Sequence, residues 1–234
     1  MIKRNVLSGF LLSAFFVVLL PSMASAAPTE SMSGNVSATS TYIWRGLAQT
    51  TDAAVQGGIQ ADFPQNIYAG AWTSTVDAGG KGGSEVDLYG GYKGKADLFG
   101  YDAGAIFYLY PNEYRRFNGQ KADLSFLELY VDLSRDFYGA KLSISSDAGT
   151  YLEGYATIPL EAWNLGLHIG RYAIDKDYHG FIDSGIQKNY FDFKVGVSKD
   201  VGGFDVEFAL TDNNLSGDIG EFRTAVTVSK GFTP

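Results

Sequence analysis

The sequence contains no cysteine, and it has only 6 prolines and 2 histidines among its 234 residues. Without cysteine no disulfide can hold the fold together. A small secreted domain seldom manages without disulfides, whereas a large closed sheet can. Few prolines, beside 29 glycines and a 15% share of aromatic residues, are typical of a chain rich in β-strands.

Basic residues are also scarce. The chain has 18 of them against 26 acidic residues, and two of the basic ones, Lys3 and Arg4, precede an apolar run at the N-terminus. Without these two, 16 basic residues face 26 acidic ones, a formal charge of −10. This excess argues against nucleic acid as a partner, because binding to it depends on neutralising phosphates with basic side chains.

The N-terminus has the pattern of a secretory signal peptide. The apolar run extends from about Val6 to Leu20, and Ala24-Ser25-Ala26 supplies the small residues that signal peptidase needs. The run is shorter than the roughly 20 residues that cross a bilayer as a helix. We therefore predict cleavage after residue 26, so that residues 1–26 are a signal peptide and residues 27–234 form one exported domain.

No apolar run after residue 27 is long enough for a membrane-spanning helix. Apolar side chains instead recur at every second position, as in Phe191, Phe193, Val195 and Val197, and polar residues or glycine stand between them. A period of two is typical of a strand with one apolar and one polar face. Twelve such segments lie near residues 34–46, 53–63, 66–75, 84–93, 98–110, 124–134, 137–146, 150–158, 163–172, 189–199, 203–211 and 221–232.

The connections between these segments alternate in length. Short turns read "PQN", "KGKA", "SRD", "PLEA" and "DVGG", and most of the intervening connections are longer. Short turns at one end, long loops at the other and an even number of strands are typical of outer-membrane barrels. A soluble barrel would bury its apolar face, but the polar face here carries too much charge for a dry interior. The predicted fold is all-β: a single antiparallel up-and-down transmembrane β-barrel of about 12 strands.

The alternation assigns each side chain to the lumen or to lipid. The predicted pore-lining residues are Arg45, Asp62, Glu85, Asp87, Asp102, Glu128, Asp132, Lys141, Glu153, His168, Asp192, Lys194, Asp205, Glu207, Glu221 and Arg223. Eleven of them are carboxylates and four are Lys or Arg. The excess of carboxylates predicts a preference for cations. The alternative is that many of these charges pair across strands and only close the barrel.

Aromatic residues on the apolar face should mark the two water boundaries of the membrane. The predicted interface aromatics are Tyr42, Trp44, Phe63, Phe107, Tyr138, Trp163, Phe204, Phe222 and Phe232. In this interpretation Tyr42 and Trp44 anchor the rim at the long-loop end, and Arg45, the residue after Trp44, points into the lumen.

Residues 33–77 resemble the N-terminal signature of the TorF-like porin family, also labelled Gcw_chp. The features that carry the resemblance are Asn35-Val36, Tyr42, Arg45-Gly46, Gln49, Ala54, Gln56-Gly57-Gly58, Tyr68-Ala69-Gly70 and Trp72. The resemblance implies an outer-membrane barrel with a channel role. One departure is the C-terminus, where Phe232 is followed by Thr233 and Pro234, whereas many outer-membrane proteins end in an aromatic residue.

The leading hypothesis for function is passive diffusion of small polar solutes through the lumen. The expected partners are outer-membrane lipid, lipopolysaccharide and the barrel-assembly machinery, and no cofactor or metal site is expected. One alternative is an adhesin or receptor that acts through its loops. Another is a membrane-embedded hydrolase, which would need a serine paired with His168 or His179, and the spacing assigns no such serine.

Two loops add weaker signals. Residues 175–186 carry aspartates at offsets similar to a calcium loop, but Ile186 stands where a bidentate glutamate is needed, so an acidic solvated loop is the simpler interpretation. The Pro111–Asp123 loop carries the adjacent Arg115 and Arg116. It could fold inward onto the acidic wall or meet lipopolysaccharide phosphates outside.

Overall fold

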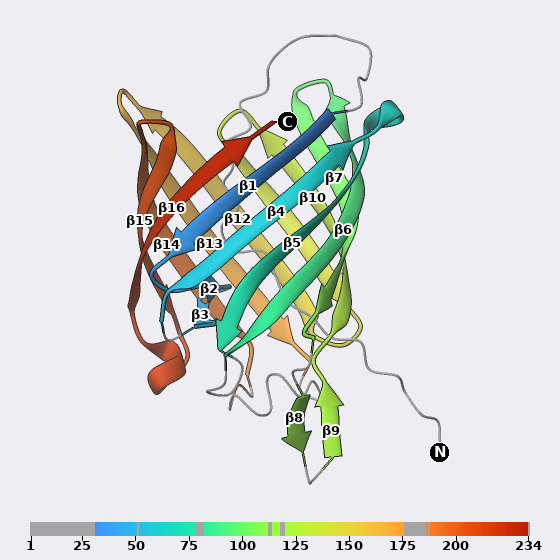
Figure 1. The fold of residues 1–234 in the computed structure, drawn as a ribbon, viewed down its shortest axis with the longest axis vertical. Helices are drawn as coiled ribbons and strands as arrows, with labels where there is room; N and C mark the ends of the chain where they lie inside the picture. Colours follow the sequence, from blue (N-terminus) through green and yellow to red (C-terminus); the bar gives the residue numbers. More distant parts are fainter. Residues whose placement is uncertain are drawn as a thin grey trace.

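The computed structural model describes residues 31–50, 52–77, 82–111, 114–117, 120–175, 186 and 188–233. The predicted signal peptide and most of the acidic loop, including His179, lie outside these residues. Within them, twelve strands form one closed barrel (Figure 1), in the order β1-β16-β15-β14-β13-β12-β11-β10-β7-β6-β5-β4. The prediction of a 12-stranded barrel is confirmed.

Each predicted segment overlaps one barrel strand. The barrel strands are β1 (Ser31–Thr39), β4 (Ala54–Asp62), β5 (Ile67–Asp77), β6 (Gly82–Ala96), β7 (Phe99–Leu109), β10 (Phe126–Arg135), β11 (Tyr138–Ser145), β12 (Gly149–Leu160), β13 (Trp163–Ile174), β14 (Tyr190–Val201), β15 (Phe204–Asn213) and β16 (Arg223–Phe232). All neighbours pair antiparallel, and the first strand closes on the last, with Gly34 opposite Phe232. Closure leaves no strand edge unpaired, as a bilayer demands.

The short turns at one end of the barrel use residues that tolerate positive φ. Asp97 between β6 and β7 has φ 51° and Asp136 between β10 and β11 has φ 52°, while Gly202 and Gly203 between β14 and β15 have φ 65° and 83°. Such left-handed conformations match the twist of tight hairpins. A three-residue 3-10 turn, η1 (Pro64–Asn66), joins β4 to β5 at the same end.

The outer surface of the barrel is apolar. On β10, Leu127, Leu129, Val131 and Leu133 are exposed, while Glu128 between them is buried. Seven of the predicted interface aromatics have the same parity, that is, they stand at the alternate positions whose side chains point outward: Phe63, Phe107, Tyr138, Trp163, Phe204, Phe222 and Phe232. An outer face so rich in exposed large apolar side chains is stable against acyl chains and unstable in water.

Basic side chains lie over several outward aromatic rings. The Lys199 ammonium lies 5.1 Å from the Trp163 ring centroid, and the Lys230 ammonium lies 4.5 Å from that of Phe204. Both pairs lie at the short-turn end of the barrel, where Trp163 begins β13 and Phe204 begins β15. Long basic side chains whose stems cover apolar surface while their heads reach water are typical of a membrane boundary.

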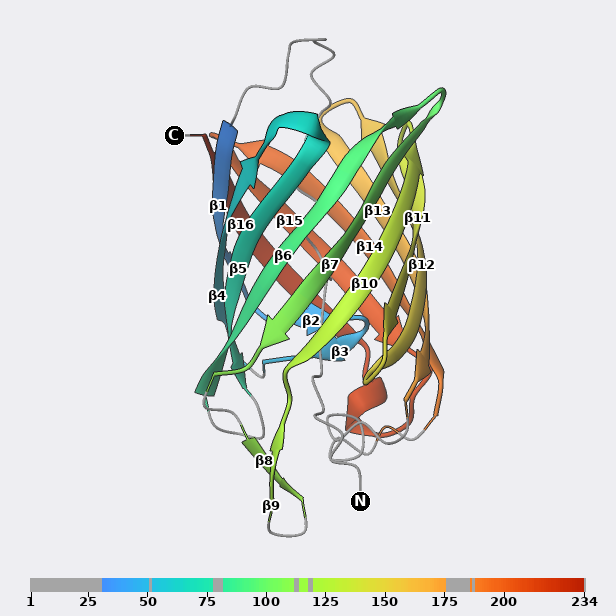
Figure 2. The same cartoon turned by 90° about the vertical axis from the view of Figure 1, so that its right-hand side faces the viewer.

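The prediction is wrong for Tyr42 and Trp44. β1 ends at Thr39, and the chain then turns into the barrel as a small hairpin of β2 (Ile43–Trp44) and β3 (Leu47–Ala48) (Figure 2). Tyr42 is 2% exposed and Trp44 is fully buried. The alternating pattern of residues 40–46 belongs to this hairpin, which has the same period of two as a barrel strand.

The Pro111–Asp123 connection forms a second hairpin, β8 (Tyr114–Phe117) and β9 (Gln120–Asp123). It projects beyond the long-loop end of the barrel, away from the lumen (Figures 1 and 2). The inward alternative for this loop is therefore wrong, and the segment that enters the lumen is the connection between β1 and β4. No helix in the described ranges is long and apolar enough to span a bilayer.

The apolar belt generates a stability prediction. Replacing Val131, an outward residue of β10 that is 49% exposed, with arginine should lower the free energy of unfolding in lipid vesicles by about 2–4 kcal/mol, because a charge near the bilayer midplane is poorly solvated. Leu98→Arg is the control. Leu98 is 65% exposed in the β6–β7 turn, where the same change should cost about 0–1 kcal/mol. Equal costs, measured by urea titration, would contradict a lipid-facing belt.

Candidate functional site in the barrel lumen

The inner wall of the barrel is polar, and nearly all the predicted pore-lining residues lie on it. Those whose parity in their strand faces the lumen are Asp62, Glu85, Asp87, Asp102, Glu128, Asp132, Lys141, Glu153, His168, Asp192, Lys194, Asp205, Glu207 and Arg223. That they line a conducting pore stays a prediction. Glu221 does not join them: it precedes β16, and its side chain is 62% exposed. Parity predicts a face, but it does not predict where a strand begins.

The lumen hairpin, residues 40–50, is fastened to the wall on both sides. The Ser40 amide donates to the Val226 carbonyl at 2.9 Å, and the Asp77 amide donates to the Gln49 carbonyl at 2.8 Å. Inside the hairpin, the Gln49 amide donates to the Tyr42 carbonyl at 2.7 Å. These backbone bonds hold the segment across the barrel as an ordered element.

Arg45 stands at the tip of the lumen hairpin. Its Nη2 donates to both carboxylate oxygens of Glu128 on β10, each at 2.9 Å, and the two side chains are 2% and 1% exposed. The backbone of Arg45 has φ 44°, an uncommon conformation for a residue with a side chain. The ion pair across the lumen accompanies this strained turn, which aims the guanidinium at the opposite wall.

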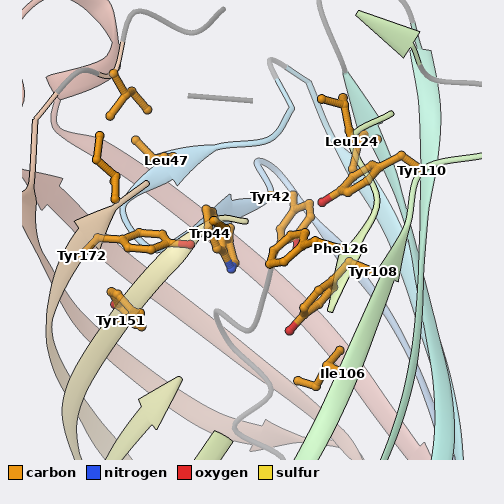
Figure 3. Packing of buried hydrophobic residues seen from close by; sticks show 14 of the residues in the cluster. Tyr42, Trp44, Leu47, Ile106, Tyr108, Tyr110, Leu124, Phe126, Tyr151 and Tyr172 are labelled. Carbon is orange, nitrogen blue, oxygen red and sulfur yellow. The ribbon is translucent and has the colours of Figure 1, made fainter. Parts of the chain in front are cut away.

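Aromatic rings surround the Arg45 guanidinium. Its Cζ lies 4.1 Å from the ring centroid of Tyr151, 4.7 Å from that of Trp44 and 4.9 Å from that of Tyr172. Trp44 meets Tyr172 edge to face at 5.7 Å (Figure 3). A guanidinium is weakly hydrated and stacks well on rings, so arginine can be buried here where lysine would fit poorly.

Gly46 fits where no side chain could. It has φ 77°, and a Cβ placed on it would lie 2.6 Å from the Cβ of Asp192 on β14. Its carbonyl accepts a hydrogen bond of 2.8 Å from Asn213 Nδ2 on β15. The pair Arg45-Gly46 therefore has a mechanical explanation: the arginine reaches β10, and the glycine lets the hairpin lie directly against β14 and β15.

An aromatic cluster fills the lumen around the hairpin (Figure 3). Its close ring pairs are Tyr42–Trp72 at 5.6 Å, Tyr108–Phe126 at 4.8 Å, Tyr151–Tyr172 at 5.3 Å and Tyr172–Tyr190 at 5.8 Å. The sequence interpretation missed these inward tyrosines because it assigned aromatic residues to the lipid boundary. Their alternation was nevertheless visible in the sequence: Tyr108 stands at an even position of its strand like the inward Asp102, and Tyr151 stands at an odd position like the inward Glu153.

Between the lumen hairpin and the short-turn end lies a cavity of about 640 Å³, here called the lumen cavity. Its inward-facing lining includes Tyr68, Trp72, Asp87, Tyr89, Lys93, Asp102, Tyr130, Asp132 and Lys141. A much smaller space of about 50 Å³ lies on another side of the hairpin, against Asp192, Lys194 and Glu207. The hairpin thus narrows a lumen that is wide on its short-turn side.

Several charges on the wall are paired. Lys93 pairs with Asp62, and Lys194 Nζ lies 2.8 Å from Glu207 Oε1. Asp102 accepts a 2.6 Å hydrogen bond from the Tyr68 hydroxyl. The sequence interpretation missed Lys93, the last residue of the predicted segment 84–93, which faces inward like Asp87 on the same strand, β6. The hypothesis of cross-strand pairing is thus correct for part of the wall.

His168 is hydrogen-bonded into the wall. Its Nε2 lies 3.1 Å from the Tyr151 hydroxyl and 3.4 Å from a Glu153 oxygen. The hydrogen bonds found for His168 in the described ranges include none to a serine. Those ranges also hold no group of three His, Cys, Asp or Glu side chains placed to bind a metal ion.

The ion pair at the hairpin tip generates a stability prediction. In a double-mutant cycle of Arg45→Met and Glu128→Gln, the coupling energy should be about 1–3 kcal/mol, because both groups are buried and each compensates the other. The free energy of unfolding in detergent would be measured by urea titration for both single variants and the double variant.

The matched control is the pair Lys93 and Asp62, whose side chains are 39% and 29% exposed. Its cycle, with Lys93→Met and Asp62→Asn, should give a coupling of about 0–1 kcal/mol because water screens the interaction. An Arg45–Glu128 coupling no larger than this control would show that the pair does not fasten the hairpin.

Comparison with solved structures finds proteins of similar fold. The structure titled "KdgM porin" is 9% identical, has a TM-score of 0.54, and covers 86% of this chain and 99% of its own. The NanC porin is 10% identical, has a TM-score of 0.53, and covers 85% of this chain and 98% of its own. Curated protein sequences give no match. A protein-family model described as "Bacterial protein of unknown function (Gcw_chp)" matches residues 23–231, and the chain belongs to this family.

Proposed function

We propose that the protein is an outer-membrane channel for the passive diffusion of small polar solutes. The observation that carries the proposal is the division of each strand between two solvents: apolar residues cover the outside, and charged residues enclose a lumen with a cavity of about 640 Å³. The resemblance in fold to proteins titled porins supports it. The predicted signal peptide would deliver the chain through the periplasm, and lipopolysaccharide and the barrel-assembly machinery are the partners that this location implies.

We further propose that the channel prefers cations. When Glu221 is removed from the predicted wall and Lys93 is added, ten carboxylates face five Lys and Arg side chains. Three of the bases, Arg45, Lys93 and Lys194, are each held by a carboxylate. The remaining excess is negative, and an electrostatic potential of that sign raises the local concentration of cations.

Single-channel recording in planar bilayers tests both proposals. Under a KCl gradient the wild-type protein should conduct, and the sign of the reversal potential should show that K⁺ is more permeant than Cl⁻ at neutral pH. Absence of conductance would end the channel proposal. Conductance with anion preference would support the channel proposal and refute the proposed preference for cations.

The lumen hairpin generates a second prediction. Replacing residues 43–48 with a glycine-serine linker should raise the single-channel conductance several-fold, because the hairpin and its aromatic neighbours occupy the cross-section of the barrel. The matched control replaces residues 114–123, the β8–β9 hairpin that projects outward, and should leave the conductance unchanged. If both replacements had the same effect, the narrow point would lie elsewhere.

A further inference from the structure

A buried carboxyl oxygen without a hydrogen-bond partner lines the lumen cavity. Asp87 on β6 lines the cavity, is only 2% exposed, and its Oδ1 has no hydrogen-bond partner within the described part of the chain. Burying an uncompensated carboxylate is costly, and the cost is removed when a cation binds beside it. Asp87 therefore marks a position in the cavity where a positively charged ligand would be stabilised.

The basic groups of the wall do not compensate Asp87. Arg45 donates to Glu128, and Lys93 pairs with Asp62. Lys141 lies over the Tyr130 ring, on β11, and its neighbours across the strands are Asp132 and Glu153. None of the ion pairs found in the described part of the chain involves Asp87, so its carboxyl group is left for a ligand.

The rings of the lumen cavity are suited to ammonium groups. The chain's own lysines show this: Lys93 Nζ lies 5.0 Å from the Tyr68 ring centroid, and Lys141 Nζ lies 4.5 Å from that of Tyr130. Tyr89 and Trp72 add further rings to the same lining. A carboxylate among aromatic faces is the combination that binds ammonium cations, since the rings attract the charge and tolerate its apolar substituents.

The cavity favours an organic cation over the alternatives. A bare metal ion would need three or more clustered ligands, and the described residues offer no such group. A neutral solute would leave the Asp87 charge uncompensated. The volume of about 640 Å³ suits a small organic molecule, because such ligands occupy pockets of about 300–1,000 Å³.

We propose that the lumen cavity is a binding site for small organic cations that carry a primary or quaternary ammonium group, with Asp87 as the anionic partner and Tyr68, Trp72 and Tyr130 as aromatic walls. This deepens the proposed function and rests on it: ammonium-bearing solutes are the class that the channel would hold on their way through. The lumen hairpin meets the lining of the cavity at Trp72, whose ring centroid lies 5.6 Å from that of Tyr42.

Isothermal titration calorimetry on the full mature chain in detergent tests the proposal. The probes are butane-1,4-diamine and tetramethylammonium, and butane-1,4-diol is the neutral control of matched length. Both cations should bind, because the diammonium ion donates charged hydrogen bonds and tetramethylammonium is attracted by the carboxylate and the rings, and the neutral diol should bind at least about tenfold more weakly. Equal binding of diol and diamine to the unaltered protein would overturn the proposal without any variant.

Variants locate the site. Asp87→Asn should weaken diamine binding by about tenfold or more, and Asp87→Glu, which keeps the charge, should restore most of it. The matched control is Asp205→Asn, which removes the same charge from an inward position on β15 outside the cavity lining, and its binding should stay within about twofold of wild type. Equal losses in both Asn variants would overturn the assignment to Asp87. Circular dichroism confirms that each variant keeps its strand content.

Conductance separates this proposal from the channel function. Conduction without diamine binding would overturn the proposed binding site and leave the proposed channel function standing. Diamine binding that depends on Asp87 in a barrel that does not conduct would establish the site and refute passage through it.

Discussion

The structure depends on one constraint: every strand lies between two solvents of opposite character. Hydrocarbon outside the barrel accepts only apolar side chains and fully paired backbone, so the strands must close on themselves and present Leu, Val and Phe outward. Because side chains alternate along a strand, the polar half of the sequence is then forced into the lumen. The charged interior is a consequence of the apolar exterior, and the solute pathway follows from both.

The lumen hairpin modifies this simple barrel. A ring of twelve strands encloses more space than the wall side chains can fill. The connection after β1 occupies part of that space, and Arg45 fixes it by an ion pair with Glu128 and by contacts with three rings. The hairpin leaves the side toward the short turns open as the lumen cavity. One segment thus determines both where the lumen is narrow and where it can hold a solute.

The barrel could be predicted from the sequence because the alternation records the two solvents directly. All twelve strands, their antiparallel order and the facing of residues such as Asp132 and Leu129 follow from that period. For Tyr42 and Trp44 the same period gave a wrong prediction, because it placed them on the lipid face. A hairpin inside the lumen also alternates, and nothing local distinguishes a tyrosine that meets lipid from one that packs on another tyrosine. The partnership of Arg45 with Glu128, 83 residues away, depends on the closed ring and has no local signal.

The sequence also predicted the ends of the strands less well than their middles. Glu221 was placed on the wall although β16 begins only at Arg223, and Lys93, the last residue of the predicted segment 84–93, was left off it although β6 continues to Ala96. The glycine of Arg45-Gly46 adopts a positive φ in the turn at the tip of the lumen hairpin, whereas the first strand already ends at Thr39. Chain order and hydrophobic period therefore predict the wall well, whereas the contents of the lumen are set by contacts between residues far apart in sequence.

The most direct test of the account uses the absence of cysteine, which gives a thiol-labelling experiment no background. Single variants Leu129→Cys, Tyr130→Cys, Val131→Cys and Asp132→Cys on β10 would be treated with a membrane-impermeant thiol reagent in lipid vesicles. The account predicts labelling at positions 130 and 132, which face the lumen, and protection at 129 and 131, which face lipid. Labelling at 129 and 131 with protection at 130 and 132 would contradict it.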